Sequence, residues 1–413
     1  MHTREFSLRP VLLAMALVLA VTIGLPALGM SVSAGTAHRS AAPAADGDLP
    51  SPDPDCSTAI ARRLVVGGDG VADGAKDTDE ELSTKTDRYS DVLLKTLQEK
   101  NFPWCLYNTA DEATDSTYTV TTRQYQDDGD PTQQSMAHAL RPNLIVLTIG
   151  RDNDGIQKYV GDCLDQVRDH RFPEAIACGA SVLANQPAFD KVRDELSEIL
   201  GKYKTQMDGN PDLVIAVTGY YNPYPKATDV ATKIPGFCAD LVDTIPTCTI
   251  RWVMLPPALV LFDQITKKLN TTIQGVVQKF EQTSQGRYFF VNPYDAFQGH
   301  CMQMDVEIKT TVYHPTNTVH DHNATKDFGC EDDSWIEDDG DTGTLTPFIY
   351  LTPAVTGVLV VATQKTEHLG LYPNADGHKC LAELIYEAKT SDDLLLKNKL
   401  GIPEGAQDPE ACS

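Results

Sequence analysis

The sequence predicts an α/β fold in which helices cover both faces of a parallel sheet. Two observations lead to this fold class. Four short runs are apolar almost throughout, which is typical of strands buried on both faces. Between them lie longer segments whose apolar residues recur at helical spacing. Strands that alternate with amphipathic helices form parallel sheets.

The predicted strands are residues 63–67, 143–150, 213–219 and 287–292. The second run, N-L-I-V-L-T-I-G, and the third, L-V-I-A-V-T-G, both end in glycine. Helical spacing is clear over 192–203 and 269–280, and a last helix is predicted over 376–388. Together these elements predict one domain over residues 56–395.

Residues 298–350 depart from this pattern. They are polar, lack clear periodicity, contain four histidines, and place seven carboxylates between Glu331 and Asp341. We expect an irregular acidic insertion or lobe there. Residues 35–55, rich in Ala, Pro, Asp and Ser, are predicted to be a flexible linker, and residues 396–413 a C-terminal tail.

The N-terminus resembles a secretory signal peptide. Arg4 and Arg9 precede an apolar run over 11–30, and the small residues 32–34 offer a cleavage site before Gly35. The sequence thus predicts a signal peptide over 1–34 and a secreted protein. The alternative is an uncleaved membrane anchor, because the apolar run is long for a signal sequence. After cleavage no further stretch is long and apolar enough to span a bilayer.

All ten cysteines follow the proposed cleavage site, so disulfides are expected in an oxidising compartment. The absence of C-x-x-C pairs gives no support to zinc-ribbon or thioredoxin chemistry. Connectivity stays open, and short loops favour Cys163–Cys178 and Cys238–Cys248, followed by Cys56–Cys105 and Cys301–Cys330.

The net charge is −24, from 34 basic and 58 acidic side chains. A surface this negative repels phosphates, which argues against a nucleic-acid partner and against docking on anionic lipid. It is compatible with cation binding.

In open α/β sheets, ligands bind where the strands end. The glycines after the first predicted strand, at 68, 70 and 74, could form a dinucleotide loop, but Asp69 and Asp73 would repel a pyrophosphate. A second strand end lies at residues 148–154, and a third block precedes the last predicted helix at residues 370–378.

Three motifs in these blocks together resemble those of the SGNH (GDSL-type) ester hydrolase family, most closely its secreted actinobacterial members. They are G-D-x-V-A-x-G at 68–74, V-L-T-I-G-x-x-N-D at 146–154 and x-P-N-A-D-G-H at 372–378. The resemblance covers the order of elements from about residue 60 to 390. It implies a three-layer α/β/α sandwich that hydrolyses acyl or acetyl esters of lipids or glycans without a cofactor.

The family mechanism uses a serine nucleophile, a histidine base and an oxyanion site formed by an asparagine and backbone N–H groups. By the resemblance, Asp69 is the family aspartate before the nucleophile, Gly70 occupies the serine position, and Tyr372 occupies the histidine position. Asn153 matches the oxyanion asparagine. The block with the second oxyanion donor falls at residues 105–109, where the usual glycine is absent.

Both catalytic side chains of the family mechanism are therefore substituted. Glycine cannot form an acyl-enzyme, and a phenol with a pKa of about 10 is a poor base near neutral pH. His368 or His378 could instead serve as a base that activates water, assisted by Asp69 or Asp73. For His378 the alternative is local packing at a helix N-terminus, and for Asn153 a loop-bracing role.

Two further clusters could bind metal. His314, His320 and His322 lie near Cys330, and an H-x-H pair in a strand places both imidazoles on one face. The acidic run with Asp338, Asp339 and Asp341 could bind Ca²⁺, although it lacks the spacing of an EF-hand loop. The alternatives are a polar loop with Cys330 in a disulfide, and a solvated acidic loop.

Three functions remain open from the sequence. The first is a secreted SGNH-type ester hydrolase that has lost its own triad. The second is a pseudoenzyme that binds an ester, glycan or protein partner in the vestigial cleft. The third is a calcium-dependent surface protein that works through its acidic lobe. The sequence gives no indication of oligomeric state.

Overall fold

The structure of the chain is a computed structural model. It describes residues 61–74, 88–99, 103–110, 120, 131–151, 153, 155–156, 162–169, 171–240, 252–302, 304–313, 319–330, 334, 336, 348–351, 359–367, 372–402 and 412. All of them belong to one compact unit, residues 43–413. The predicted signal peptide and the predicted linker both lie wholly outside the described residues.

The core is a five-stranded sheet in which every neighbouring pair is parallel. Its strands in spatial order are β2 (Trp104–Asn108), β1 (Arg62–Gly68), β3 (Leu144–Thr148), β4 (Val214–Thr218) and β5 (Tyr288–Val291). Every residue of β3 and β4 is buried, as their continuous apolar runs predict. The four predicted strands are thereby confirmed, and β2 is an addition at the sheet edge.

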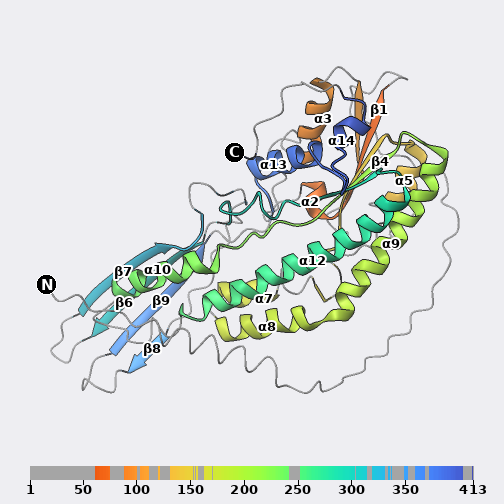
Figure 1. Ribbon diagram of the computed structural model, residues 1–413. Helices are drawn as coiled ribbons and strands as arrows, with labels where there is room; N and C mark the ends of the chain where they lie inside the picture. Colours follow the sequence, from red (N-terminus) through yellow and green to blue (C-terminus); the bar gives the residue numbers. More distant parts are fainter. Residues whose placement is uncertain are drawn as a thin grey trace. The chain divides into compact units, whose positions relative to one another are not determined.

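Two groups of helices pack on this sheet. In one, α12 (Leu255–Thr283) contacts α8 (Phe172–Ala184), α9 (Gln186–Gly209) and β5. In the other, α13 (Ala375–Tyr386) packs on α3 (Tyr89–Glu99), which contacts β2. Figure 1 shows the two groups on opposite faces of the parallel sheet. The architecture is thus the expected three-layer α/β/α sandwich.

Shorter helices complete this part of the chain: α2 (Gly70–Asp73), α5 (Gln133–Leu140), α7 (Asp162–Arg168), α10 (Ala227–Asp240) and α14 (Leu396–Lys399). The three helices predicted from apolar spacing correspond to α9, α12 and α13, and both α9 and α12 extend beyond the predicted residues. Among the described residues, no helix is long and apolar enough to cross a bilayer.

The expectation of an irregular lobe over 298–350 needs correction. A second, antiparallel sheet forms here and continues past residue 350, with strand order β7-β6-β9-β8. Its strands are β6 (Asp305–Tyr313), β7 (Val319–Asp327), β8 (Phe348–Leu351) and β9 (Leu359–Glu367). The sequence does not indicate β7, because polar residues occupy most of its positions and no alternation of polar and apolar residues marks it as a strand.

Three disulfides are described, of which two were predicted. Cys163–Cys178 joins α7 to α8, and Cys301–Cys330 closes the segment that contains β6 and β7. The third, Cys380–Cys412, was not predicted. Cys105 is also disulfide-bonded, and the proposed partners Cys56 and Cys248 lie outside the described residues.

The described residues of the predicted C-terminal tail, 396–402 and 412, pack on the domain. Leu396, Leu400 and Ile402 are buried, and Cys412 is bonded to Cys380 in α13.

Candidate functional site at the strand ends

The strand order places the candidate site between β1 and β3. The chain passes from β1 outward to β2, then returns across β1 to β3 and continues in that direction to β4 and β5. Ligands of open α/β sheets bind at such a reversal, outside the carboxyl ends of the strands. The segment with Asp69 and Gly70 follows β1, and the segment with Arg151 and Asn153 follows β3. Two of the three family-like motifs therefore meet at this point.

Glycine at position 68 allows the two strand ends to approach closely. Gly68 has a φ of +132°, and a Cβ built there would lie 1.9 Å from the carbonyl oxygen of Thr148. The backbone N–H of Asp69 donates to that same oxygen at 2.9 Å. A side chain at this position would push β1 and β3 apart just where the site begins.

Gln133 in α5 holds the end of β1 from the other side. Its side-chain oxygen accepts from the backbone N–H of Gly68 at 2.8 Å, and its amide donates to the carbonyl of Gly68 at 3.1 Å. The buried side-chain amide thus binds both backbone groups of Gly68 at the end of β1, as the backbone of a neighbouring strand would.

Gly70 begins α2 immediately after the strand. Asp69 caps this helix, because its side-chain oxygen Oδ1 accepts from the backbone N–H of Val71 at 3.1 Å. Gly74 ends the helix with a φ of +81°. A strand-to-helix turn thus follows β1, and Gly70, the residue matched to a serine by the sequence resemblance, places no side chain in it.

The carboxylate of Asp69 is fully buried and hydrogen-bonded on both sides. Its second oxygen, Oδ2, accepts from the hydroxyl of Tyr220 at 2.5 Å. That hydroxyl in turn accepts from the backbone N–H of Arg151 at 3.1 Å. Tyr220 therefore connects the segment after β1 to the segment after β3.

Tyr220 is held in place by Asn270 of α12. The Asn270 side chain accepts from the backbone N–H of Tyr220 and donates to its carbonyl, each at 2.7 Å. A Cβ at the preceding residue, Gly219, would lie 2.7 Å from the Asn270 oxygen, so glycine is needed there. These contacts fix the phenol over the strand ends.

Tyr372, the residue matched to a histidine by the sequence resemblance, contacts this cluster through Arg151. The guanidinium of Arg151 lies 4.9 Å from the centroid of the Tyr372 ring and 5.8 Å from that of Tyr220. Both distances are within the range of cation–π attraction. Arg151 is only 4% exposed, so this attraction is little screened by water. The third family-like motif thus joins the other two.

Asn153, at the oxyanion position, is fully buried and donates an N–H of its amide to a carboxylate oxygen of Glu195 in α9 at 2.9 Å. An asparagine amide carries two N–H donors. At least one of them is thus directed to the helix, as expected for a residue that braces its loop.

The block predicted to hold a second oxyanion donor lies at the end of β2. The amide of Asn108 donates to the carbonyl of Ala72 at 3.3 Å, so this block lies beside α2. However, the backbone N–H of Thr109 donates to the carbonyl of Val66 at 2.7 Å, continuing the sheet.

His378 is fully buried in α13, and its ring centroid lies 6.0 Å from that of Tyr89 in α3. Burial also raises the pKa of Tyr89, whose hydroxyl is hydrogen-bonded to Thr148 at 3.0 Å. This environment favours the packing interpretation of His378. His368, the other candidate base, lies outside the described residues.

The predicted metal clusters receive little support from the described residues. His320 and His322 pair with Val312 and Thr310 in the register of β7 with β6. Cys330 is in a disulfide and is excluded as a ligand of this cluster. Over the described ranges, no group of three or more His, Cys, Asp or Glu side chains is placed to hold a metal. His314 and the calcium candidates Asp338, Asp339 and Asp341 lie outside those ranges.

Sequence reasoning missed the supporting residues of the site. Gln133 and Glu195 are polar residues on helices distant in sequence, and nothing in the sequence indicates their partners. Arg151 and Tyr220 could have been noticed, because each lies within three residues of a predicted strand end and such residues line the crevice of an α/β sheet.

Comparison with known proteins gives structural matches only. No family model matches the chain, and no curated protein matches it. An extracellular lipase from Streptomyces rimosus is 16% identical, covering 58% of this chain and 84% of its own, with a TM-score of 0.38. Phospholipase A1 from Streptomyces albidoflavus NA297 is 15% identical, covering 77% and 94%, with a TM-score of 0.40. BT4096, a gut microbial diltiazem-metabolizing enzyme, is 16% identical, covering 57% and 37%, with a TM-score of 0.27. At these TM-scores the likeness adds nothing to the argument from the site.

Proposed function

We propose that this chain is a secreted SGNH-like protein that binds an ester or glycan ligand at the strand ends without the family's serine chemistry. The observation that carries the proposal is Gly70, which stands at the first position of the turn after β1 where the family places its nucleophile. The three described disulfides support an extracellular location, since such bonds persist in oxidising compartments.

The groups around Gly70 support a binding role rather than proton transfer. Asp69 is occupied by the N–H of Val71 and the hydroxyl of Tyr220, and Asn153 is bound to Glu195. The Arg151 guanidinium lies over the Tyr372 ring, and this cation–π contact favours a fixed position of the ring. Such a prearranged polar cluster at the switch point of an α/β sheet can recognise a ligand without reacting with it.

Hydrolysis of p-nitrophenyl acetate and butyrate tests the proposal. We expect no turnover by the natural chain above that of its Asn153→Ala variant. We expect the Gly70→Ser/Tyr372→His variant to hydrolyse these esters at least tenfold faster than the natural chain. The reason is that a nucleophile and a base acting together contribute on the order of 10⁶-fold to kcat in an intact triad.

The matched control is Gly70→Ala/Tyr372→Phe, which changes the same two positions without adding a nucleophile or a base. It should stay at the level of the natural chain. Turnover by the natural chain that Asn153→Ala removes would contradict the proposal and would instead establish hydrolysis without the family serine.

A further inference from the structure

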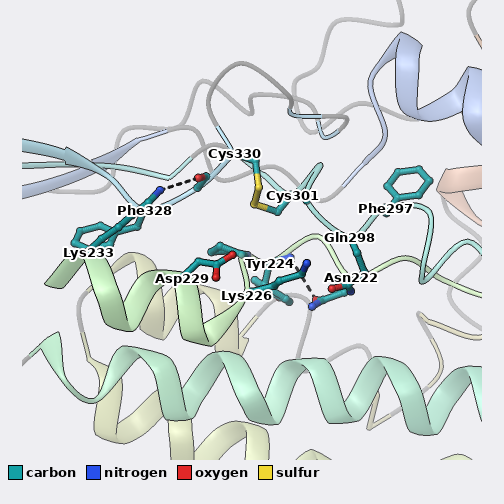
Figure 2. A pocket seen from close by; sticks show the side chains of 13 residues that line it. Asn222, Tyr224, Lys226, Asp229, Lys233, Phe297, Gln298, Cys301, Phe328 and Cys330 are labelled. Carbon is teal, nitrogen blue, oxygen red and sulfur yellow. Dashed lines mark hydrogen bonds between the residues drawn. A yellow bond between two sulfur atoms is a disulfide. The ribbon is translucent and has the colours of Figure 1, made fainter. Parts of the chain in front are cut away.

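A cavity of about 280 Å³ lies beyond the ends of β4 and β5. Its wall comes from the loop between β4 and α10, the first half of α10, the loop after β5, and residues 328–330 at the end of β7 (Figure 2). None of the residues assigned above to the strand-end cluster lines it. At about 30 Å³ for each water-sized group, it has room for roughly nine non-hydrogen atoms.

The inner lining is apolar. Tyr224, Phe297 and Phe328 are each at most 3% exposed and contribute to the wall, and the Cys301–Cys330 disulfide lies across from α10 (Figure 2). Ligand cavities of proteins typically combine such an apolar lining with a few polar groups that orient the ligand.

These walls are held rigidly. Phe297 stacks on Tyr221 with ring centroids 4.5 Å apart, and Phe328 stacks on Trp252 at 5.3 Å. The ammonium of Lys233 donates to the carbonyl of Gly329 at 3.2 Å, which ties α10 to the segment after β7. A preformed cavity binds with a smaller ordering cost than one that must assemble around its ligand.

The charged groups of the lining favour an anion. Lys226, Lys233 and Asp229 line the cavity, which gives a net charge of +1 on a chain whose total is −24. Lys226 is solvent-exposed and lies at the edge of the cavity, so its ammonium can meet a charged head group while the remainder of a ligand enters the apolar interior.

We propose that this cavity binds a small amphiphilic carboxylate, with its apolar chain against Phe297, Phe328 and the disulfide and its carboxylate at Lys226. An eight-carbon acid, with ten non-hydrogen atoms, is close to the size that the volume admits. The proposal is independent of the strand-end site and of any activity there.

Calorimetric titration with octanoate and with its neutral analogue octanamide tests the two parts of the proposal separately. We expect saturable binding of both, with octanoate bound more tightly. Lys226→Gln should weaken the affinity for octanoate three- to tenfold and leave the affinity for octanamide unchanged, because only the charged head group interacts with the ammonium. Raising the salt from 50 to 500 mM should weaken octanoate in the same selective way.

Four variants locate the binding. Gln298→Trp, at a half-buried position in the lining, should fill the cavity and abolish binding of both ligands, whereas Gln298→Ala should retain it. Lys279→Gln, the same charge change at an exposed position of α12, should have no effect. Tyr372→Ala should also have no effect, which separates this cavity from the strand-end site.

If octanoate still binds to the Gln298→Trp variant, the ligand does not occupy this cavity. If Tyr372→Ala abolishes octanoate binding, the ligand binds at the strand ends instead. Equal weakening of both ligands by Lys226→Gln would overturn the role of the ammonium. Absence of saturable binding by the natural chain would overturn the proposal as a whole.

Discussion

The hydroxyl of Tyr220 links two loops that meet only in the folded chain. It donates to the buried carboxylate of Asp69 and accepts from the backbone N–H of Arg151. A hydrogen bond to a buried charged group contributes more to stability than one between neutral groups. Removing the donor is costly, because the remaining partner stays buried without its hydrogen bond. The residue that best explains the geometry of the site is thus one that takes no part in the family mechanism.

We expect Tyr220→Phe to lower the free energy of unfolding by about 2 kcal/mol, because it leaves Asp69 buried with one fewer donor. The ring and its contact with Arg151 are retained, so the change isolates the hydroxyl. Urea denaturation followed by circular dichroism measures the difference.

Tyr107→Phe serves as the control for this substitution. Tyr107 is half-buried in β2 and packs against the core, so the same loss of a hydroxyl should change the free energy by at most about 0.5 kcal/mol. Equal effects of the two substitutions would contradict the importance of the link between Tyr220 and Asp69.

At the scale of elements, the end of β1 shows how the scaffold of the site is maintained. Helix α5 supplies a side chain that binds both backbone groups of Gly68, and Gly68 itself permits the close approach of β3. A strand that ends inside a protein leaves buried backbone groups, which must find partners. Gln133 provides them, so the turn that begins α2 is held from outside its own segment.

We expect Gln133→Ala to lower the free energy of unfolding by about 2 to 4 kcal/mol, because it leaves a backbone donor and a backbone acceptor of Gly68 buried without partners. Gln134→Ala, one position along the same helix and half-buried, makes the same change in helix propensity and should cost less than about 1 kcal/mol. Thermal or urea unfolding of the pair gives the comparison, and similar values for both variants would show that the clamp is unimportant.

The same scale shows which elements could be predicted. The buried strands of the parallel sheet were predictable because apolar residues fill both of their faces, and α9, α12 and α13 because their apolar stripes are regular. The antiparallel sheet was not, since β7 and β9 mix polar residues into both faces and no regular alternation marks them. Its strands also pair between segments as distant in sequence as β6 and β9.

At the scale of the whole molecule, disulfides tie the outlying segments to the core. Cys301–Cys330 closes the segment of β6 and β7, and Cys380–Cys412 fixes the C-terminal residues to α13. The second bond spans 32 residues. Within this span, Leu396 and Leu400 are buried, so the segment is bound by packing as well as by the cross-link.

We expect the Cys380→Ser/Cys412→Ser variant to be less stable by about 3 to 4 kcal/mol, because the unfolded chain gains the freedom of the opened loop. The melting temperature should fall accordingly under non-reducing conditions. The control is the same variant after full reduction of both proteins, where the difference in melting temperature should largely disappear. A difference that persists after reduction would assign the effect to the serine side chains instead.

The fold class, four of the five strands of the parallel sheet and the three segments that carry the candidate site are predictable from the sequence alone. This information is local, because buried strands, amphipathic helices and glycine turns each depend on consecutive residues. Which polar groups bind one another at the site depends instead on the tertiary structure. Tyr220 to Asp69, Asn153 to Glu195 and Arg151 to Tyr372 are pairs between distant segments. Such pairs depend on how strands and helices pack in three dimensions, and so do the second sheet and the cavity beside it.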